Sequence, residues 1–407
     1  MKIIVTGLIA QHYTLAGVTW DYLQYLVGFK QLGNEVYYFE DSGEWPYNID
    51  GGVSGNEWIA TDCDKNIEYL NSILKRFDLA DRWAYYFPTK AKWFGLSNAK
   101  RKSVIETADM LINVSGTLAK LDKYSSIKKL VYIDSDPGFT QVKLKIGLKK
   151  FIKRVSAHNI HFTFGETLPE YLNDPAYKWK PTRSPIVLSE WTPVKNHRDA
   201  YSTIMNWISY KPLKYSRKRY NQKDVEFIKY LDLPKNFTDL SFEVALAKIY
   251  PKNWKLSVEK YLPLMDLTSD QISTPSELLS QFNWKVVDPD EECNDIDSYR
   301  NYISQSKGEW SVAKGGYVVS ESGWFSCRSA CYLAAGRPVI VQNTGFDKVL
   351  PSGEGILAFN NLNEAVEAVR KVESNYSLHT KRAREIAVEY FDSNKLLTKL
   401  IEQSFES

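Results

Sequence analysis

Apolar residues follow two periodicities in the N-terminal part of the chain, and these predict strands and helices in turn. Residues 2–6 form a short apolar run typical of a buried strand. Apolar side chains then recur every three or four residues over residues 15–32, which predicts a helix that ends at Gly33. Residues 35–40 alternate as a strand. This order predicts a βαβ unit, whose first loop would lie at the carboxyl end of a parallel strand, where ligands bind.

The alternation continues along the chain. Strands are predicted at residues 110–114, 129–134, 161–164, 202–207, 283–288 and 316–319, and helices at residues 299–306 and about 380–402, with residues 256–262 ambiguous. A proline-rich stretch that begins at Lys180 interrupts the pattern. The pattern therefore predicts two Rossmann-like, doubly wound α/β domains with parallel sheets. We expect an N-terminal domain at residues 1–185, a linker at 186–201, a C-terminal domain at 202–385 and a helix at 386–407 that packs back on the first domain.

The segment of residues 320–341 is the most informative. It reads as a polar, glycine-containing loop, a short helix and a buried strand. Gly336 is suited to end the helix in the left-handed conformation, and Pro338 prevents its continuation. The first N–H groups of a helix lack intrahelical partners and carry partial positive charge, so this layout favours a phosphate site. A capped helix in an ordinary α/β core is the alternative.

Three side chains at the start of that helix fit a phosphate. Ser326 and Ser329 are able to cap the helix or donate hydrogen bonds, and Arg328 offers a planar, permanently charged guanidinium. We expect the substitution Arg328→Ala to weaken binding of the phosphate ligand with little loss of fold.

The sequence that follows carries a family resemblance. From Ala334 the chain runs AAGRPVIVQNTGFDKVLPSGEGILAFNNLNEAVEAVRKV. This order of small-residue helix, Gly-x-Pro-Val, short loop, Gly-x-Gly strand and Glu-Ala helix resembles the donor-binding half of glycosyltransferases with the GT-B fold. The resemblance covers residues 305–400 and implies two domains facing a cleft, with a nucleotide sugar, a UDP-sugar, bound by the C-terminal domain. Many such enzymes carry two acids where this chain has Gly323 and Cys331.

The resemblance also implies roles for further residues of the C-terminal domain. Lys314 would be a second cation for the diphosphate, with a surface lysine as the alternative. The loop with Asn343, Thr344 and Gly345 would meet the donor sugar. Glu354 would meet a ribose or sugar hydroxyl, with a turn carboxylate as the alternative.

The N-terminal domain supplies the candidate catalytic residues. His12 follows the first strand, and Asp134 and Asp136 end another strand. In inverting plant-type GT-B enzymes a histidine base is oriented by an aspartate, and His12 with Asp134 resembles that arrangement in position. Asp136 is the alternative carboxylate for His12 or for an acceptor hydroxyl. Asp134 and Asp136 also spell Asp-x-Asp, a metal-binding element of another glycosyltransferase fold, but the Pro137-Gly138 that follows favours a strand-ending turn, so we predict no metal.

Composition narrows the setting and the partners. The 407 residues are too many for one compact core. Four cysteines without paired spacing, no apolar run of membrane-spanning length and no signal-peptide pattern favour a cytoplasmic protein without membrane insertion. The first loop contains no Gly-x-Gly-x-x-Gly, so a nicotinamide site has no support. We expect no required cofactor, with the nucleotide sugar as co-substrate.

The net charge is only +3, but basic residues gather in two runs, at residues 143–154 and 211–223. Such runs are solvated faces in many proteins; here they also fit a polyanion, whether nucleic acid, acidic glycan or lipid headgroup. We therefore predict a glycosyltransferase whose acceptor is a hydroxylated base of DNA, a glycan or a small molecule. The missing acidic pair motivates one alternative, a catalytically degenerate nucleotide-sugar or nucleic-acid binding protein. A sugar-nucleotide epimerase is another.

Overall fold

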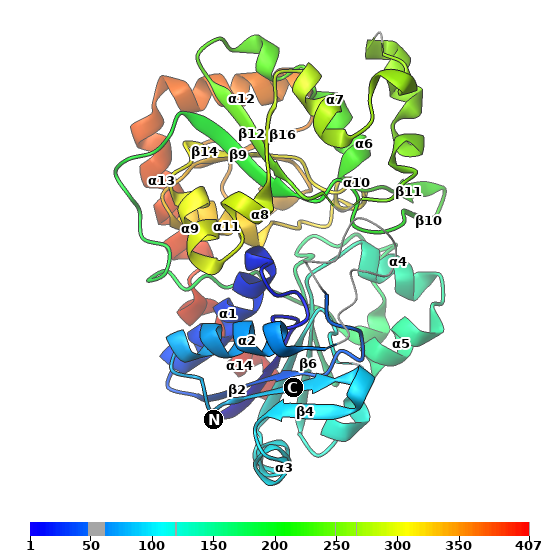
Figure 1. The fold of residues 1–407 in the computed structure, drawn as a ribbon, viewed down its shortest axis with the longest axis vertical. Coiled ribbons are helices and arrows are strands. Elements are labelled where there is room, and N and C mark those ends of the chain that lie inside the picture. The colour runs from blue at the N-terminus through cyan, green and yellow to red at the C-terminus, as the bar shows by residue number, and fades with distance from the viewer. Residues whose placement is uncertain (48–61, 119, 249, 266, 407) are drawn as a thin grey trace.

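The chain folds into two sheets that lie one above the other, each flanked by helices (Figure 1). The computed structural model describes residues 1–47, 62–118, 120–248, 250–265 and 267–406. The loops that follow the strands of one sheet meet the loops that follow the strands of the other, as the contacts of Asp136 with Tyr210 and Tyr317 record. The carboxyl ends of the two sheets therefore face each other.

The N-terminal sheet has eight strands in the order β4-β3-β2-β1-β5-β6-β7-β8. They are β1 (Lys2–Thr6), β2 (Glu35–Glu40), β3 (Trp83–Phe87), β4 (Lys92–Gly95), β5 (Met110–Val114), β6 (Lys129–Asp134), β7 (Ile160–Thr163) and β8 (Lys180–Pro181). Neighbouring strands are parallel except β3 and β4. The strands predicted at residues 2–6, 35–40, 110–114 and 129–134 are confirmed, whereas β3, β4 and β8 were not predicted.

Five helices cover this sheet within the described residues: α1 (Ala16–Gln31), α2 (Asp64–Arg76), α3 (Asn98–Thr107), α4 (Phe139–Lys145) and α5 (Lys149–Ser156). Helix α1 is the predicted helix after β1, and the chain leaves it through Gly33, whose φ of +78° lies in the left-handed region. That conformation favours glycine because a Cβ atom would be strained there.

The C-terminal sheet has six parallel strands in the order β13-β12-β9-β14-β15-β16. They are β9 (Ala200–Met205), β12 (Ser241–Leu246), β13 (Lys285–Val287), β14 (Gly308–Ser311), β15 (Val339–Gln342) and β16 (Ile356–Phe359). A separate hairpin is formed by β10 (Leu213–Tyr215) and β11 (Lys218–Tyr220). The helices are α6 (Lys223–Phe227), α7 (Pro275–Gln281), α8 (Pro289–Glu292), α9 (Ile296–Ser304), α10 (Gly315–Ser320), α11 (Cys327–Ala334), α12 (Leu362–Ser374), α13 (Tyr376–Tyr390) and α14 (Ser393–Phe405).

The strand predicted at residues 316–319 is wrong, because this segment belongs to helix α10 and the strand is β14. Strand β14 carries Glu309 and Ser311, both buried. Buried polar residues hide a strand from a hydrophobic pattern, and the apolar run of α10 is too short to separate helix from strand. Strand β12 was also not predicted.

The C-terminal helix predicted at about residues 380–402 is two helices. Helix α13 ends at Tyr390, and the carboxylate of Asp392 accepts a hydrogen bond from the N–H of Asn394 to begin α14. Helix α14 packs on α1 of the N-terminal domain, where a Cβ at Gly28 would lie 2.5 Å from Leu397. The chain thus returns to the first domain.

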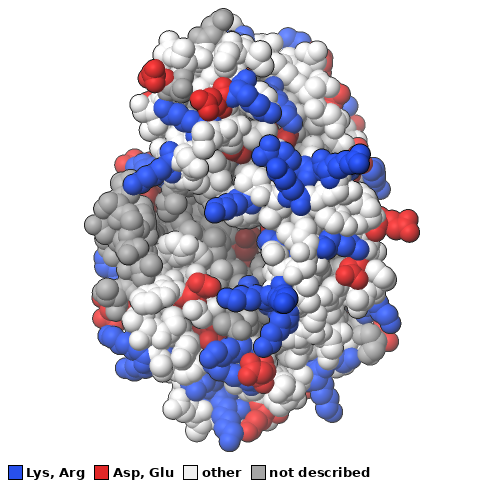
Figure 2. Space-filling view, turned by 90° about the vertical axis from the view of Figure 1, so that its right-hand side faces the viewer, with Lys and Arg blue, Asp and Glu red and all other residues white. Residues whose placement is uncertain are grey.

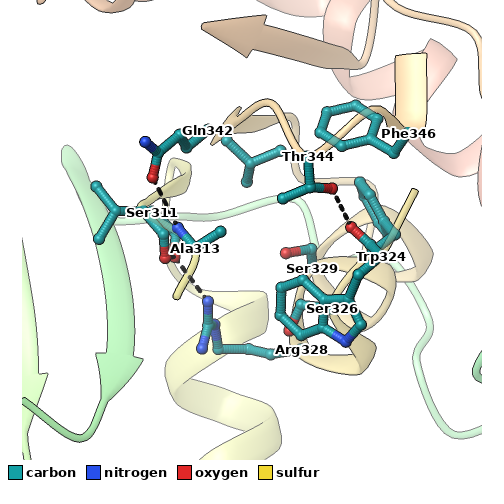
Figure 3. A pocket seen from close by; sticks show the side chains of 12 residues that line it. Ser311, Ala313, Trp324, Ser326, Arg328, Ser329, Gln342, Thr344 and Phe346 are labelled. Carbon is teal, nitrogen blue, oxygen red and sulfur yellow. Dashed lines mark hydrogen bonds between the residues drawn. The ribbon is translucent and has the colours of Figure 1, made fainter. Parts of the chain in front are cut away.

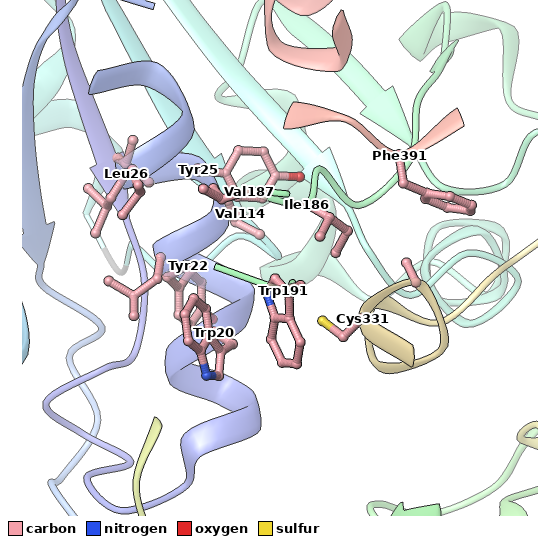
Figure 4. Close-up of a cluster of buried hydrophobic side chains, with 14 of the residues drawn as sticks. Trp20, Tyr22, Tyr25, Leu26, Val114, Ile186, Val187, Trp191, Cys331 and Phe391 are labelled. Carbon is pink, nitrogen blue, oxygen red and sulfur yellow. The ribbon is translucent and has the colours of Figure 1, made fainter. Parts of the chain in front are cut away.

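A continuous apolar core joins the two domains (Figure 4). Trp20 of α1 and Trp191 of the segment predicted as a linker are both buried, with ring centroids 5.1 Å apart. The indole N–H of Trp20 donates to the carbonyl oxygen of Ile296 in α9 at 3.0 Å. Ile186 and Val187 are also buried, so part of the segment between the sheets is core.

Glycines allow a close approach of the two domains beside this core. A Cβ at Gly316 of α10 would lie 2.3 Å from the ring of Phe139 in α4, and a Cβ at Gly138 would lie 2.7 Å from Ser320. Contacts under 3.0 Å require one partner to shift. Helices α4 and α10 therefore touch only because both positions lack a side chain.

We predict that Gly316→Ala destabilises the protein by about 1–3 kcal/mol, because the added methyl group would overpack against the buried ring of Phe139. Chemical denaturation measures the change. The double variant Gly316→Ala with Phe139→Leu is the control, since a smaller side chain should recover part of the loss. Equal losses in the single and double variants would contradict the contact.

Candidate functional site

A small pocket with apolar and polar lining residues lies at the carboxyl ends of β14 and β15 beside the first turn of α11 (Figure 3). It is lined by Ser311, Val312, Ala313, Trp324, Phe325, Ser326, Arg328, Ser329, Val341, Gln342, Thr344 and Phe346. Its volume of about 20 Å³ is room for about one water molecule. A larger ligand can occupy this place only if side chains or domains move. The pocket brings together four residues predicted for the donor: Ser326, Arg328, Ser329 and Thr344.

The pocket lies next to the point where the strand order of the sheet reverses, which is between β9 and β14. Parallel sheets bind ligands at such points because neighbouring loops turn to opposite faces. The pairing of β9 with β14 ends at Ser202 and Glu309, although both strands continue. The strands therefore separate just below the pocket.

The guanidinium of Arg328 fills this separation. It donates to the carboxylate of Glu309 in β14, to the carbonyl oxygen of Ile204 in β9 and to the hydroxyl of Ser311 in β14, each at 2.7 Å. The side chain of Glu309 is 0% exposed and that of Arg328 is 13% exposed. Arg328 thus replaces the hydrogen bonds that the strands no longer exchange. Contrary to the expectation from the sequence, Arg328→Ala should therefore destabilise the fold.

The predicted layout around α11 is present. Ser326 is the residue before the helix, Gly336 follows it with a φ of +70°, and β15 begins at Val339. Three N–H groups of the first turn, those of residues 327–329, have no intrahelical acceptor by helix geometry. The side chain of Ser326 makes no capping hydrogen bond to this turn. These N–H groups are suited to an anion.

Lys314 lies between the domains. Its ammonium nitrogen is 3.1 Å from the hydroxyl of Tyr210 and 3.5 Å from a carboxylate oxygen of Asp136. Asp136 also accepts from Tyr210 at 2.6 Å and from the hydroxyl of Tyr317, and its carboxylate lies 3.9 Å from Lys143. Burial raises the pKa of Asp136, but the ammonium groups of Lys314 and Lys143 outweigh it, so the pKa is lowered. Asp136 is therefore an anion that ties the domains together.

Lys223, at the start of α6, was not singled out for the donor. Burial lowers its pKa well below the usual range, and the positive charges of Arg328 and Lys314 lower it further, whereas Glu309 raises it. Lys223 therefore lies within electrostatic range of Arg328, Lys314 and Glu309. In the sequence, Lys223 is visible only as the last member of the basic run at residues 211–223. Its proximity to Arg328 depends on the tertiary fold, which the sequence pattern does not show.

His12 lies in the loop between β1 and α1, with its ring stacked on Tyr47 at 4.5 Å. Burial lowers its pKa to about 4, so the imidazole is neutral near pH 7. Its buried Nδ1 has no hydrogen-bond partner among the described residues. A neutral imidazole is able to accept a proton.

The structure does not pair His12 with Asp134. The carboxylate of Asp134 is buried and accepts from Gln141 at 2.9 Å, from Thr163 at 2.8 Å and from the N–H of Asp136 at 3.1 Å. Burial raises its pKa, against these hydrogen bonds. Asp134 therefore braces the turn after β6, and its catalytic role stays a prediction.

The loop after β15 is held by its own side chains. Asn343 accepts from the N–H of Gly345 at 2.9 Å and donates to Asp347 at 2.9 Å, and the hydroxyl of Thr344 donates to the carbonyl oxygen of Trp324 at 2.5 Å. Gly345 has a φ of +88°, and a Cβ there would lie 2.8 Å from the carbonyl oxygen of Glu321. This loop therefore borders the pocket in a fixed shape.

The structure places Glu354 away from the pocket, contrary to the role predicted for it in donor binding. It precedes β16 and so lies at the amino end of that strand, whereas the pocket lies at the carboxyl ends. Its carboxylate is 3.4 Å from the guanidinium of Arg382 in α13. Because the chain crosses from one edge of the sheet to the other before each parallel strand, Glu354 is not part of the pocket.

The described residues contain no group of three His, Cys, Asp or Glu side chains that could hold a metal ion. Within the same residues, no helix combines the length and the apolar character needed to cross a bilayer.

Comparisons with known proteins agree with this architecture. No protein-family model and no curated protein matches the chain. Among solved structures, an α-glucosyltransferase in complex with UDP and a 13-mer DNA containing a central A:G mismatch aligns over 99% of each chain, with a TM-score of 0.57 and 12% identity. HepE from Anabaena, in complex with UDP-glucose, aligns over 100% of each chain, with a TM-score of 0.54 and 10% identity. Sucrose-phosphate synthase from Thermosynechococcus elongatus aligns over 99% of each chain, with a TM-score of 0.51 and 11% identity.

These similarities extend over the whole chain, so the protein has the GT-B fold, as the sequence resemblance implied. The predicted fold class is thereby confirmed.

We predict that Arg328→Ala lowers the free energy of unfolding by about 3–5 kcal/mol, because the buried carboxylate of Glu309 would lose its partner. Chemical denaturation of the variant measures this loss. Arg370→Ala is the matched control, since Arg370 pairs with Glu367 on the surface and should cost less than about 1 kcal/mol. Equal effects of the two substitutions would contradict the structural role of Arg328.

Proposed function

We propose that the protein is a glycosyltransferase that moves a sugar from a nucleoside diphosphate sugar, a UDP-sugar, to an acceptor hydroxyl. The observation that carries the proposal is the pocket at the reversal of the C-terminal sheet. The first-turn N–H groups of α11 have no intrahelical acceptor there, and Lys223 lies within electrostatic range of Arg328 in the same turn and of Lys314. This combination suits a diphosphate, which is the leaving group in such a transfer.

The donor assignment has a second support. The α-glucosyltransferase was solved with UDP and HepE with UDP-glucose, and both share the whole fold. In the proposed complex, the first turn of α11 and Lys223 would contact the diphosphate. The loop with Asn343 and Thr344 would contact the sugar. No metal is needed in this proposal, because helix N–H groups and ammonium groups neutralise the leaving phosphate.

The transfer forms a bond between the anomeric carbon of the sugar and the acceptor oxygen. It breaks the bond between that carbon and the diphosphate oxygen, and the acceptor hydroxyl loses its proton. His12 is the proposed proton acceptor for inversion, because its imidazole is neutral at pH 7 and its loop follows β1 at the edge that faces the C-terminal domain.

For the acceptor we propose a hydroxyl group carried by a polyanion, such as a hydroxylated base of DNA or a glycan. The support is the placement of two basic segments next to the domain junction, with Lys143 beside both Asp136 and the ring of Tyr210. One of the structures with the same fold was solved with DNA.

We predict that UDP raises the melting temperature with or without Mg²⁺. A ligand at 100 times its dissociation constant stabilises by about 2.7 kcal/mol, which for a chain of this length corresponds to roughly 3 °C. Differential scanning fluorimetry with UDP, GDP, ADP, TDP and CMP measures the shift and its base specificity. If none of these nucleotides raises the melting temperature, the proposed diphosphate site is rejected.

We predict that Lys223→Gln weakens UDP binding at least tenfold, because the diphosphate would lose a contact with a desolvated cation. Lys235→Gln is the matched control: Lys235 is an exposed lysine of the same domain that pairs with Asp232 at 2.7 Å. Calorimetric titration compares the two variants. Equal affinity in both would remove Lys223 from the site.

We predict that His12→Ala leaves UDP affinity unchanged and lowers turnover at least a hundredfold. In the wild-type enzyme, the base is active when neutral, so kcat/KM should fall only as the pH drops through about 4, the pKa of His12. A pH profile in which activity is lost near pH 6.5, or full turnover of the variant, would reject His12 as the base.

A further inference from the structure

Two basic segments from different domains lie side by side on one face of the molecule. Helices α4 and α5 belong to the N-terminal domain, and the β10–β11 hairpin belongs to the C-terminal domain; all four lie on the right-hand side of Figure 1. Strand β10 contacts α4, and the ring of Phe139 in α4 meets Tyr210 at 5.1 Å, edge to face. We call the surface formed by α5 and the hairpin the basic face.

Figure 2 looks onto this side and shows Lys and Arg side chains gathered above and below a hollow. The exposed cations of the basic face are Lys149, Lys150, Lys153, Arg154, Lys211, Lys214, Arg217, Lys218 and Arg219. None of them forms an ion pair with a described carboxylate, whereas exposed lysines elsewhere do, such as Lys235 with Asp232 and Lys102 with Glu106. The cations of this face therefore lie outside close ion pairs, and only a longer-range attraction between Lys218 and Glu321 is recorded within the described chain.

The positive charges of the hairpin destabilise the hairpin itself. Lys214 and Arg219 stand directly opposite each other in the register of β10 and β11. Like charges at opposite positions destabilise a pair of strands, and an isolated two-stranded hairpin is marginal even without them. A polyanion bound across both strands would turn this repulsion into attraction.

The turn of the hairpin is a second sign that this surface has a function. Ser216 and Arg217 occupy its two central positions with φ values of +49° and +62°. Turns with two positive φ values favour Asn and Gly, because other side chains are strained there. Arg217 thus keeps a cation at the tip where glycine would fit better. Strained positions of this kind gather at functional sites.

The shape of the basic face favours B-form DNA among polyanions. A two-stranded β-ribbon fits the major groove of B-form DNA, whereas the major groove of an RNA helix is too narrow for protein side chains to read. A lipid surface fits less well, because binding in the membrane interface scales with buried apolar area. The large apolar side chains exposed in this region are few, namely Ile146 at 41%, Leu148 at 44% and Tyr171 at 36%, and they offer little such area.

We propose that the basic face binds duplex DNA, with the β10–β11 hairpin in the major groove and α5 on the phosphate backbone. The inference deepens the proposed function and rests on it only in making DNA the acceptor. A base that carries the acceptor hydroxyl would leave the stack to reach the pocket of the C-terminal domain. DNA binding itself needs neither donor nor turnover, so it is testable separately.

The test uses the full-length protein and a fluorescein-labelled DNA duplex of about 20 base pairs, with fluorescence anisotropy at several KCl concentrations. Two triple variants remove charge from the face: Lys214→Gln with Arg217→Gln and Arg219→Gln, and Lys149→Gln with Lys150→Gln and Lys153→Gln. The control removes the same charge elsewhere: Lys102→Gln with Lys381→Gln and Lys399→Gln, on α3, α13 and α14. Thermal melting without ligand, measured in parallel, verifies that each variant is folded.

We expect the wild-type protein and the control to bind with a steep salt dependence. Each basic-face variant should lose affinity by roughly tenfold or more, and its slope of log Kd against log salt should fall by about 2–3, because each phosphate contact contributes about 0.9. Affinity of the basic-face variants equal to that of the control would overturn the proposal. So would tighter binding to duplex RNA, or to vesicles with anionic lipid, than to DNA.

The same measurements separate this inference from the proposed function. DNA binding that depends on the hairpin, without sugar transfer from any nucleotide sugar, would uphold the basic face and reject the transferase. Sugar transfer to another acceptor by a protein that does not bind the duplex would reject the basic face and uphold the transferase.

Discussion

The guanidinium of Arg328 is the interaction on which the C-terminal domain depends. Strands β9 and β14 must separate where their order reverses, and the separation leaves a carbonyl oxygen of β9 and a buried carboxylate of β14 without strand partners. One planar cation with several donors satisfies both, and it also bonds Ser311. Lysine, with a single ammonium, is less suited to span the gap. The buried charge pair of Arg328 and Glu309 therefore holds the two diverging strands together next to the pocket.

A second constraint is the contact between the domains. Asp136 receives hydrogen bonds from two tyrosines of the C-terminal domain and lies close to the ammonium groups of Lys314 and Lys143. Beside it, Gly316 lets Phe139 reach the backbone of α10. Lys314 thus links Tyr210 of its own domain to the carboxylate of the N-terminal domain.

Charge is arranged differently inside and outside this junction. Inside, Glu309 and Asp136 each have a cation within contact distance, because an unpaired charge in a buried place is costly. Outside, the cations of the basic face form no close ion pair with a described carboxylate, and they include a like-charged cross-strand pair. Water screens exposed charges, so such a surface is tolerated, but its alignment over two domains concentrates positive potential on one side of the molecule.

Some features were readable from the sequence because they are local. Periodicity predicted helix α1 and strands β1, β2, β5 and β6 of the first domain. The Gly336–Pro338 stop and the order of elements after Ala334 predicted α11, β15 and the GT-B resemblance. Strand β14 escaped because its polar residues are buried by tertiary partners. The role of Arg328, the isolation of Asp134 from His12 and the position of Lys223 also depend on contacts between distant segments. The sequence by itself determined the alternation of strands and helices, since backbone geometry and side-chain periodicity act within a few residues. Only the tertiary structure decided which charges meet, because strand order and domain packing bring together residues of different elements, such as Glu309 with Arg328 and Asp136 with Lys314.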